Sequence, residues 1–353
     1  MDDKESKRTV SGKCGEELTY HFEDGVLSIE GTGPMFDLDK LTWGKWCTEI
    51  QKVIIGYGCT KISTDAFSFF TNLSSIMIPE SVSDIGASAF EGCSNLTSIA
   101  IPDGVTAIGP CLFKDCSSLT SVTMPDSISW IGEETFHGCS SLTSVTIPAN
   151  VWSFENEAFK GCSSLTSIVI PDSVTEIGYG AFEGCSSLTS IVIPDSVTEI
   201  GCGAFEGCSS LSNITIQNGL EEIGSFAFWK CSGLTSIVIP DSVTEIGYGA
   251  FEGCSSLISI AIPVGVTRIE DYTFCDCNSL KDITLPDGLT EIGFYAFAYC
   301  RSLANITIPE SVTKIDNYAF YMCSSEFYAK IPDGVRKIGA NAFRNLACDE
   351  EDW

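Results

Sequence analysis

Cysteine is the residue of this chain whose number and spacing most invite chemistry. The 353 residues include 18 cysteines, enough for several disulfides or zinc sites. The chain has no C-x2-C pair and only two histidines, His21 and His137, so we predict no metal site. Eleven of the cysteines recur every 23 residues, at Cys93, Cys116, Cys139, Cys162, Cys185, Cys208, Cys231, Cys254, Cys277, Cys300 and Cys323.

This spacing argues against disulfides along the repeat. In stacked coils, cysteines at one repeat position have parallel side chains whose Cβ atoms stay about 4.8 Å apart, wider than the ~3.8 Å of a normal disulfide. We therefore predict a line of buried thiols that act as small apolar core residues. Cys14 and Cys47 lie outside this line, and a bridge between them is left open. So many thiols suit a reducing or anaerobic setting.

The sequence carries no catalytic motif. It contains no G-x-S-x-G, no Walker loop and no H-E-x-x-H. Its acidic residues recur with the repeat, whereas a catalytic pair would break the pattern once. We predict that the protein is not an enzyme and uses no cofactor.

A 23-residue repeat organises the chain. The segment at residues 165–187 returns unchanged at residues 234–256. No single repeat can bury its apolar residues alone, so equal spacing predicts stacked coils that share one core. Thirteen phenylalanines mark the register without one insertion: Phe67, Phe90, Phe113, Phe136, Phe159, Phe182, Phe205, Phe228, Phe251, Phe274, Phe297, Phe320 and Phe343.

Each coil is predicted to contain one strand and one tight turn. In LTSIVIP (residues 165–171), apolar residues alternate with outward Ser167 and Val169, and the proline ends the strand. DSVTEIG then contributes Val174 and Ile177 to the core. AFEGC is too short for a helix and predicts a single turn or 3₁₀ turn.

The pattern LxxIxIPxxVxxIGxxAFxxCxx resembles the repeat of the BspA-like leucine-rich repeat family, related to treponemal surface proteins. The resemblance implies a leucine-rich repeat solenoid, with parallel strands on the concave face and short turns or 3₁₀ segments on the convex face. Residues 11–35 are similar to the module that precedes such repeats. Their alternating segments flank Asp24-Gly25 and predict a β-hairpin that, with Trp43 and Trp46, caps the first coil.

Four segments follow from this organisation. We expect a disordered tail at residues 1–8 and an N-terminal β cap module at residues 9–52. An array of about thirteen 23-residue repeats follows at residues 53–346, and an acidic tail at residues 347–353.

The outward positions of the strands are the first candidate binding surface. They are small and mostly polar, which suits contact with a partner but also suits any solvated sheet. Because the central coils are nearly identical, many weak contacts are favoured over one epitope. The candidates are Ser121, Thr123, Ser144, Thr146, Ser167, Val169, Ser190, Val192, Asn213, Thr215, Ser236, Val238, Asp282 and Thr284.

Three tyrosines form a second candidate. Tyr272, Tyr295 and Tyr318 occupy one repeat position in consecutive coils, where most coils carry small or polar residues. Exposed tyrosines are good interface anchors. The alternative is that they pack on the convex turns and seal this part of the array.

The net charge of −28 excludes several partners. Phosphate backbones and anionic lipids repel such a surface, so we predict no nucleic-acid binding. Apolar runs are too short for membrane insertion. Columns of Asp and Glu leave weak divalent cation binding open, although no calcium loop appears and diffuse counterions are favoured.

The resemblance implies a non-enzymatic protein-binding or adhesion solenoid that contacts host matrix or cell-surface components through its strand face. It also implies a cell-surface or secreted location. The first residues lack a signal peptide, which leaves a cytoplasmic location as the alternative. The rival functions are a structural spacer, an intracellular scaffold without a specific ligand, and an ice- or crystal-surface binder.

Overall fold

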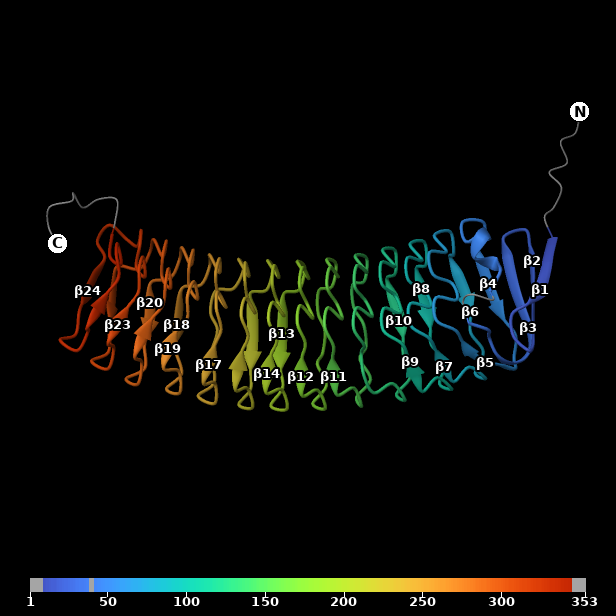
Figure 1. The fold of residues 1–353 in the computed structure, drawn as a ribbon, viewed down its shortest axis with the longest axis horizontal. Helices are drawn as coiled ribbons and strands as arrows, with labels where there is room; N and C mark the ends of the chain where they lie inside the picture. Colours follow the sequence, from blue (N-terminus) through green and yellow to red (C-terminus); the bar gives the residue numbers. More distant parts are fainter. Residues whose placement is uncertain (1–8, 38–40, 345–353) are drawn as a thin grey trace, which may run out of the picture. The chain divides into compact units, whose positions relative to one another are not determined.

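The computed structural model describes residues 9–37 and 41–344. These residues divide after Pro171 into two compact units. The expected tails at residues 1–8 and 347–353 lie outside the described residues. Each unit is a β-solenoid of stacked coils, which confirms the predicted fold class (Figure 1).

The first unit begins with the predicted hairpin. Strands β1 (Thr9–Lys13), β2 (Glu17–Glu23) and β3 (Val26–Pro34) pair antiparallel in this order. Asp24 and Gly25 form the turn with φ of 49° and 80°. Both values are left-handed, as a two-residue hairpin turn of type I′ requires.

Strand β3 connects the hairpin to the coils. It pairs in parallel with β4 (Lys52–Ile55), and near its end Gly33 pairs with Cys59 of β5 (Cys59–Ile62). The 3₁₀ helix η2 (Trp43–Trp46) places the indole of Trp43 on the ring of Phe67, with 5.9 Å between centroids. The hairpin and Trp43 thus cover the apolar end of the first coil, which array ends require.

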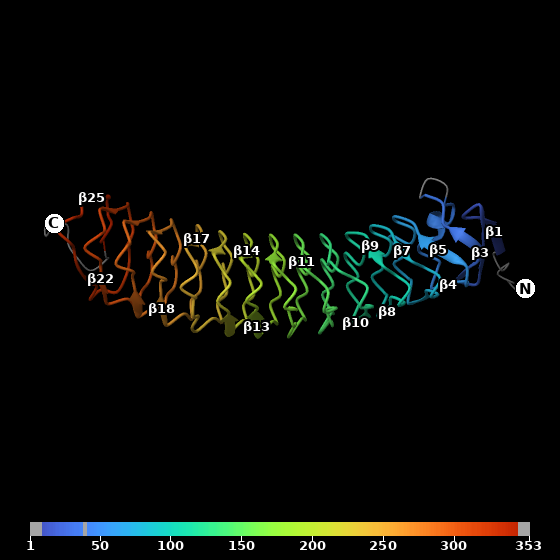
Figure 2. The same ribbon diagram turned by 90° about the horizontal axis from the view of Figure 1, so that it is seen from below.

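Two rows of parallel strands follow, and Figure 2 shows them along opposite edges of the coils. The first row comes from the LTSIVIP segments and the second from the TEI segments. In the first unit, the first row continues with β6 (Ser75–Met77), β8 (Ser98–Ala100) and β10 (Ser121–Thr123). The second row continues with β7 (Asp84–Ile85), β9 (Ala107–Ile108) and β11 (Ser153–Phe154).

The second unit repeats both rows. The first row comprises β13 (Ser190–Ile193), β15 (Asn213–Ile216), β18 (Ser259–Ala261), β20 (Asp282–Thr284), β22 (Asn305–Thr307) and β24 (Tyr328–Lys330). The second row comprises β12 (Glu176–Ile177), β14 (Glu199–Ile200), β16 (Glu222–Ile223), β17 (Glu245–Ile246), β19 (Arg268–Ile269), β21 (Glu291–Ile292), β23 (Lys314–Ile315) and β25 (Lys337–Ile338).

The second row was not predicted from the sequence, which placed Ile177 only in the core. Its two-residue strands are too short to show a period-two pattern. Conversely, the first row is less continuous than expected: in the second unit it forms the strand pairs β13–β15, β18–β20 and β22–β24.

Phenylalanine stacks form the core of each unit. In the second unit, neighbouring ring centroids from Phe182 to Phe343 lie 5.2–5.5 Å apart, and their planes differ by at most 11°. The AFEGC segments form turns. In each turn from Phe67 to Phe320, two positions, two residues before and two after the phenylalanine, have positive φ, for example Gly203 and Gly207 at 64° and 69°.

Candidate functional site

All fourteen candidate residues of the first row are exposed. We call this surface the strand face. Within β13 and β15, Ser190 pairs with Asn213 and Val192 with Thr215, while the isoleucines between them are buried. The alternation therefore places polar and apolar side chains on opposite sides, as the sequence predicts. The candidates at residues 121–169 belong to the first unit and those at residues 190–284 to the second.

The strand face of the second unit contains an open hollow of about 350 Å³. Small side chains at Ser236, Ser259 and Ala261 leave this space between Val238 and Thr284. Buried isoleucines form its floor, and Asp282 contributes one carboxylate. The signal that identifies the hollow in the sequence is Ala261, which replaces the valine or threonine of the neighbouring coils.

Exposed apolar residues also collect on this part of the chain. Val238 is 79% exposed, Val264 72%, Val192 49% and Ile258 47%. Val238 lines the hollow itself. A surface that leaves apolar side chains in water beside small polar ones is suited to burial against another protein.

The three candidate tyrosines stack on one another. Tyr272 and Tyr295 have ring centroids 5.3 Å apart, and Tyr295 and Tyr318 4.9 Å apart. Phe294 packs edge-on against all three rings. Each tyrosine is half-buried and has a positive φ, so packing among themselves explains much of their presence. Their use as interface anchors stays a prediction.

The second row carries the acidic column of the second unit. Glu176, Glu199, Glu222 and Glu245 lie side by side in parallel register. Burial and the two neighbouring glutamates raise the pKa of Glu222 above its usual value.

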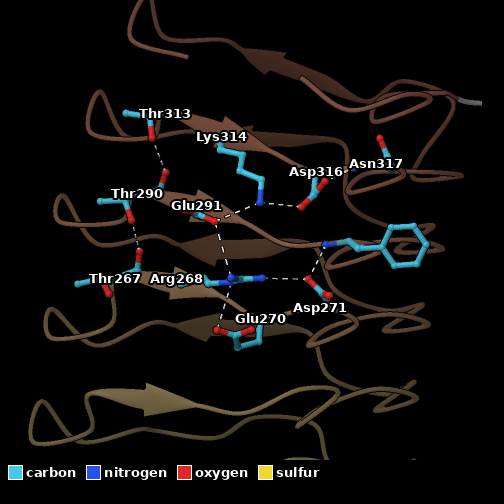
Figure 3. Close-up of polar contacts among 11 residues, drawn as sticks. Thr267, Arg268, Glu270, Asp271, Thr290, Glu291, Thr313, Lys314, Asp316 and Asn317 are labelled. Atoms are coloured by element: carbon cyan, nitrogen blue, oxygen red, sulfur yellow. Dashed lines mark hydrogen bonds and ion pairs between the residues drawn. The ribbon is translucent and has the colours of Figure 1, made fainter. Parts of the chain in front are cut away.

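The column ends where basic residues replace glutamate (Figure 3). The guanidinium of Arg268 lies 3.2 Å from carboxylate oxygens of both Glu270 and Asp271. Lys314 lies 3.3 Å from Glu291 and 2.9 Å from Asp316. These pairs compensate the charge of the later coils, whereas no ion pair is seen for the second-row glutamates of β12, β14, β16 and β17 within the described part of the chain.

The repeat cysteines are buried and free, and they do more than fill space. The thiol of Cys208 donates a hydrogen bond to the carbonyl of Phe182 in the preceding coil, at 3.1 Å. Nine further ladder thiols make the same contact at 3.0–3.2 Å. Burial raises the pKa of Cys208 to about 12, so these thiols are protonated and unreactive at neutral pH.

The bridge that was left open between Cys14 and Cys47 does not form. Both thiols are free, and the thiol of Cys14 is buried. Burial, and to a smaller extent the charge of nearby Cys59, raises the pKa of Cys14 to about 12. Gly15 follows Cys14 in a bend and lies so close to the carbonyl of Pro34 that a Cβ there would clash with it.

One group of metal-ligating side chains converges in the first unit. Donor atoms of Glu134, His137 and Glu157 lie within 4.8 Å of one another. No local motif reveals this group in the sequence, because Glu134 and Glu157 are 23 residues apart and meet only through the stacking of the coils. His137 is the only histidine of the repeats, and Glu134 precedes it by three residues. The next coil has Glu157 at the repeat position of Glu134.

No helix among the described residues is long and apolar enough to cross a membrane.

Comparison with known proteins identifies a matching family model and several similar solved structures. A family model described as a BspA-type leucine-rich repeat region matches residues 45–165, 130–258 and 244–350. A search of curated proteins finds no match.

Several solved structures are similar. A leucine-rich repeat protein from Bacteroides ovatus is 27% identical with a TM-score of 0.63, over 94% of this chain and 91% of that chain. A leucine-rich repeat protein from Eubacterium ventriosum is 23% identical with a TM-score of 0.54, over 92% and 97%. The pneumococcal vaccine antigen PcpA is 17% identical with a TM-score of 0.50, over 92% and 98%. The last two share the fold only.

Proposed function

Because the chain belongs to the BspA-type leucine-rich repeat family, we propose that it binds other proteins through its strand face. Neither the family nor the fold indicates catalysis. The observation that carries the proposal is the hollow formed by Ser236, Val238, Ser259 and Ala261, since it combines free space with exposed apolar surface.

The hollow suits a protruding side chain of a partner. Its volume of about 350 Å³ lies at the lower end of the range of small-ligand pockets, and its floor is apolar. An aliphatic or aromatic side chain would bury its surface against the isoleucine floor. The small residues at the rim let a partner backbone approach closely.

Charge restricts which partners fit. With a net charge of −28, the protein repels acidic surfaces at long range. Asp282 beside the hollow favours a neighbouring basic group on the partner. We therefore expect partners with a neutral or basic surface and an exposed apolar side chain, among matrix or cell-surface proteins.

Substitution of the hollow tests the proposal. Ala261→Arg places a long side chain into the space and should weaken binding to a matrix or cell-surface partner at least tenfold in biolayer interferometry. Thr244→Arg is the matched control, because Thr244 is exposed next to the second row and its replacement adds the same positive charge away from the strand face. Circular dichroism spectra should be unchanged for both variants.

Two outcomes would contradict the proposal. Binding that is equally strong in the wild type and Ala261→Arg would exclude the hollow. If Ala261→Arg, Ser190→Arg and Val192→Arg together also leave binding intact, the whole strand face is excluded. The absence of any saturable partner in a panel of such proteins would favour the spacer function.

We extend the proposal to a cell-surface location, which the family resemblance supports. Protease treatment of intact source cells should remove the protein, while a cytoplasmic marker stays intact. Protection of the protein until the cells are lysed would support the scaffold alternative.

A further inference from the structure

We propose that Glu134, His137 and Glu157 form a binding site for a divalent transition-metal ion of the zinc class. All three residues lie in the first unit, on turns of two consecutive coils. The Nδ1 atom of His137 lies 3.2 Å from Oε2 of Glu157 and 3.6 Å from Oε1 of Glu134. One imidazole and two carboxylates are a donor set that zinc, manganese and iron accept.

The repeat brings these donors together. Glu134 and Glu157 occupy the same position in adjacent coils, 23 residues apart. His137 follows Glu134 by three residues, and its backbone N–H donates to the carbonyl of Glu134 at 3.1 Å, which closes the turn. The turn therefore directs the imidazole back toward both carboxylates.

The Nδ1 atom of His137 faces both carboxylates. It is shielded from solvent and makes no well-aligned hydrogen bond among the described residues, although it lies 3.2 Å from Oε2 of Glu157 and 3.6 Å from Oε1 of Glu134. A buried nitrogen without a well-aligned hydrogen bond costs free energy. An ion between the three donors would accept its lone pair.

The donor spacing fits an ion. Two atoms that both bind zinc at about 2.1 Å with tetrahedral angles lie about 3.4 Å apart. The distances of 3.2 Å and 3.6 Å from Nδ1 bracket this value. The donor atoms of the two carboxylates also lie within 4.8 Å of each other.

Two lysines orient the carboxylates without occupying the site. Lys114 contacts Oε2 of Glu134, whereas His137 faces Oε1. Lys160 contacts Oε1 of Glu157 at 3.0 Å, whereas His137 faces Oε2. Each glutamate thus uses one oxygen for a lysine and keeps the other for the ion. Such supporting contacts are common around metal ligands.

Zinc titration by calorimetry tests the site. The background replaces Cys202, which is exposed, by serine so that its thiol does not compete, and also replaces Cys348, which lies outside the described residues. We expect one zinc ion per chain, and at least tenfold weaker binding in His137→Ala and in Glu157→Gln. The matched control is His21→Ala, because His21 also lies beside a glutamate, 3.6 Å from Glu23, and its loss should leave binding unchanged.

Cobalt spectroscopy supplies a second readout. Nitrogen and oxygen ligands should give weak visible bands without thiolate charge transfer. The thiol of Cys111 lies 3.4 Å from Oε2 of Glu134, the oxygen that also contacts Lys114. Charge transfer that disappears in Cys111→Ser would assign the ion to the thiol and overturn the proposal. Equal zinc affinity in the wild type, His137→Ala and Glu157→Gln would overturn it as well, as would a lack of saturable binding. Unchanged circular dichroism of Glu157→Gln guards against misfolding.

Discussion

At the scale of single residues, the ladder cysteines link neighbouring coils. Each thiol is fully or almost fully buried, and it donates a second hydrogen bond to the carbonyl of the phenylalanine one coil earlier, which also accepts a backbone N–H of its own coil. A carbonyl oxygen has two lone pairs, so cysteine is suited to this position by its small size and its weak S–H donor. The sequence predicts the burial from the regular spacing. It does not predict the hydrogen bond, because an apolar residue would fit the same pattern.

Replacement of one ladder thiol should therefore destabilise the protein. Cys208→Ala removes the donor to Phe182 and leaves a small cavity, so we expect a loss of about 1–2 kcal/mol in the free energy of unfolding. Chemical denaturation measures this change. The control Cys202→Ala concerns an exposed thiol and should stay within about 0.5 kcal/mol of the wild type. Equal effects of the two variants would contradict a stabilising role of the thiol.

At the scale of elements, the two rows differ in how far the sequence predicts them. The strand face follows from period-two alternation, and all its outward positions are exposed as expected. The second row consists of two-residue strands that exist only because identical segments stack, so no local pattern reveals them. The group of Glu134, His137 and Glu157 could not be predicted for a related reason. Its members come together because the coils stack in register, and no local motif marks them.

The glutamate column makes the second row sensitive to pH. The raised pKa of Glu222 means that its charged form is disfavoured in the folded protein. The resulting penalty is present at neutral pH, above the folded pKa, and disappears as the pH falls below the unfolded value of 4.5.

Glu222→Gln should accordingly stabilise the protein at pH 7 by about 0.2–0.5 kcal/mol, because it removes a like charge between Glu199 and Glu245. At pH 4 the difference should vanish. Denaturation at both pH values checks this, with the exposed neighbour Glu221→Gln as the control. Destabilisation by Glu222→Gln at pH 7 would show that the carboxylate binds something instead.

At the scale of the whole molecule, one apolar column supports each unit. In the first unit the stack runs from Trp43 through Phe67 to Phe159, and in the second from Phe182 to Phe343. The strict period of the phenylalanines predicts these columns. The sequence predicts that Trp43 covers the first coil, but not that its ring stacks on Phe67, because the cap does not follow the repeat.

The buried thiols make the folded protein less stable at alkaline pH. Burial raises the pKa of ten ladder cysteines, for example that of Cys93 to about 12, from an ordinary value of 9.0. Their contribution to stability is complete below pH 9 and is lost as the pH rises toward the folded values. We expect a constant melting temperature from pH 7 to 8 and a progressive fall by several degrees toward pH 10.5.

Differential scanning calorimetry measures this fall. High salt screens repulsion between surface charges but does not reach the thiols, so the decline should persist in 1 M NaCl, where the Debye length is only about 3 Å. A flat melting temperature up to pH 10.5, or a decline that salt abolishes, would contradict the assignment.

The two left-handed positions of each turn have a consequence for how such a chain can grow. A coil with glycine at both, such as the one that contains Gly203 and Gly207, presents no side chain at these positions to the coils above and below it, and no side chain of a neighbouring coil packs against them. It can be copied in blocks of 23 codons without disturbing its surroundings, and the sequence contains such verbatim copies. Coils with Glu134 or Tyr272 at these positions are tied to their neighbours and cannot be moved freely. Coils with glycine at both positions can thus be added to lengthen the protein, while coils with distinctive side chains stay unchanged. Gene duplication extends such a protein without altering its distinctive segments.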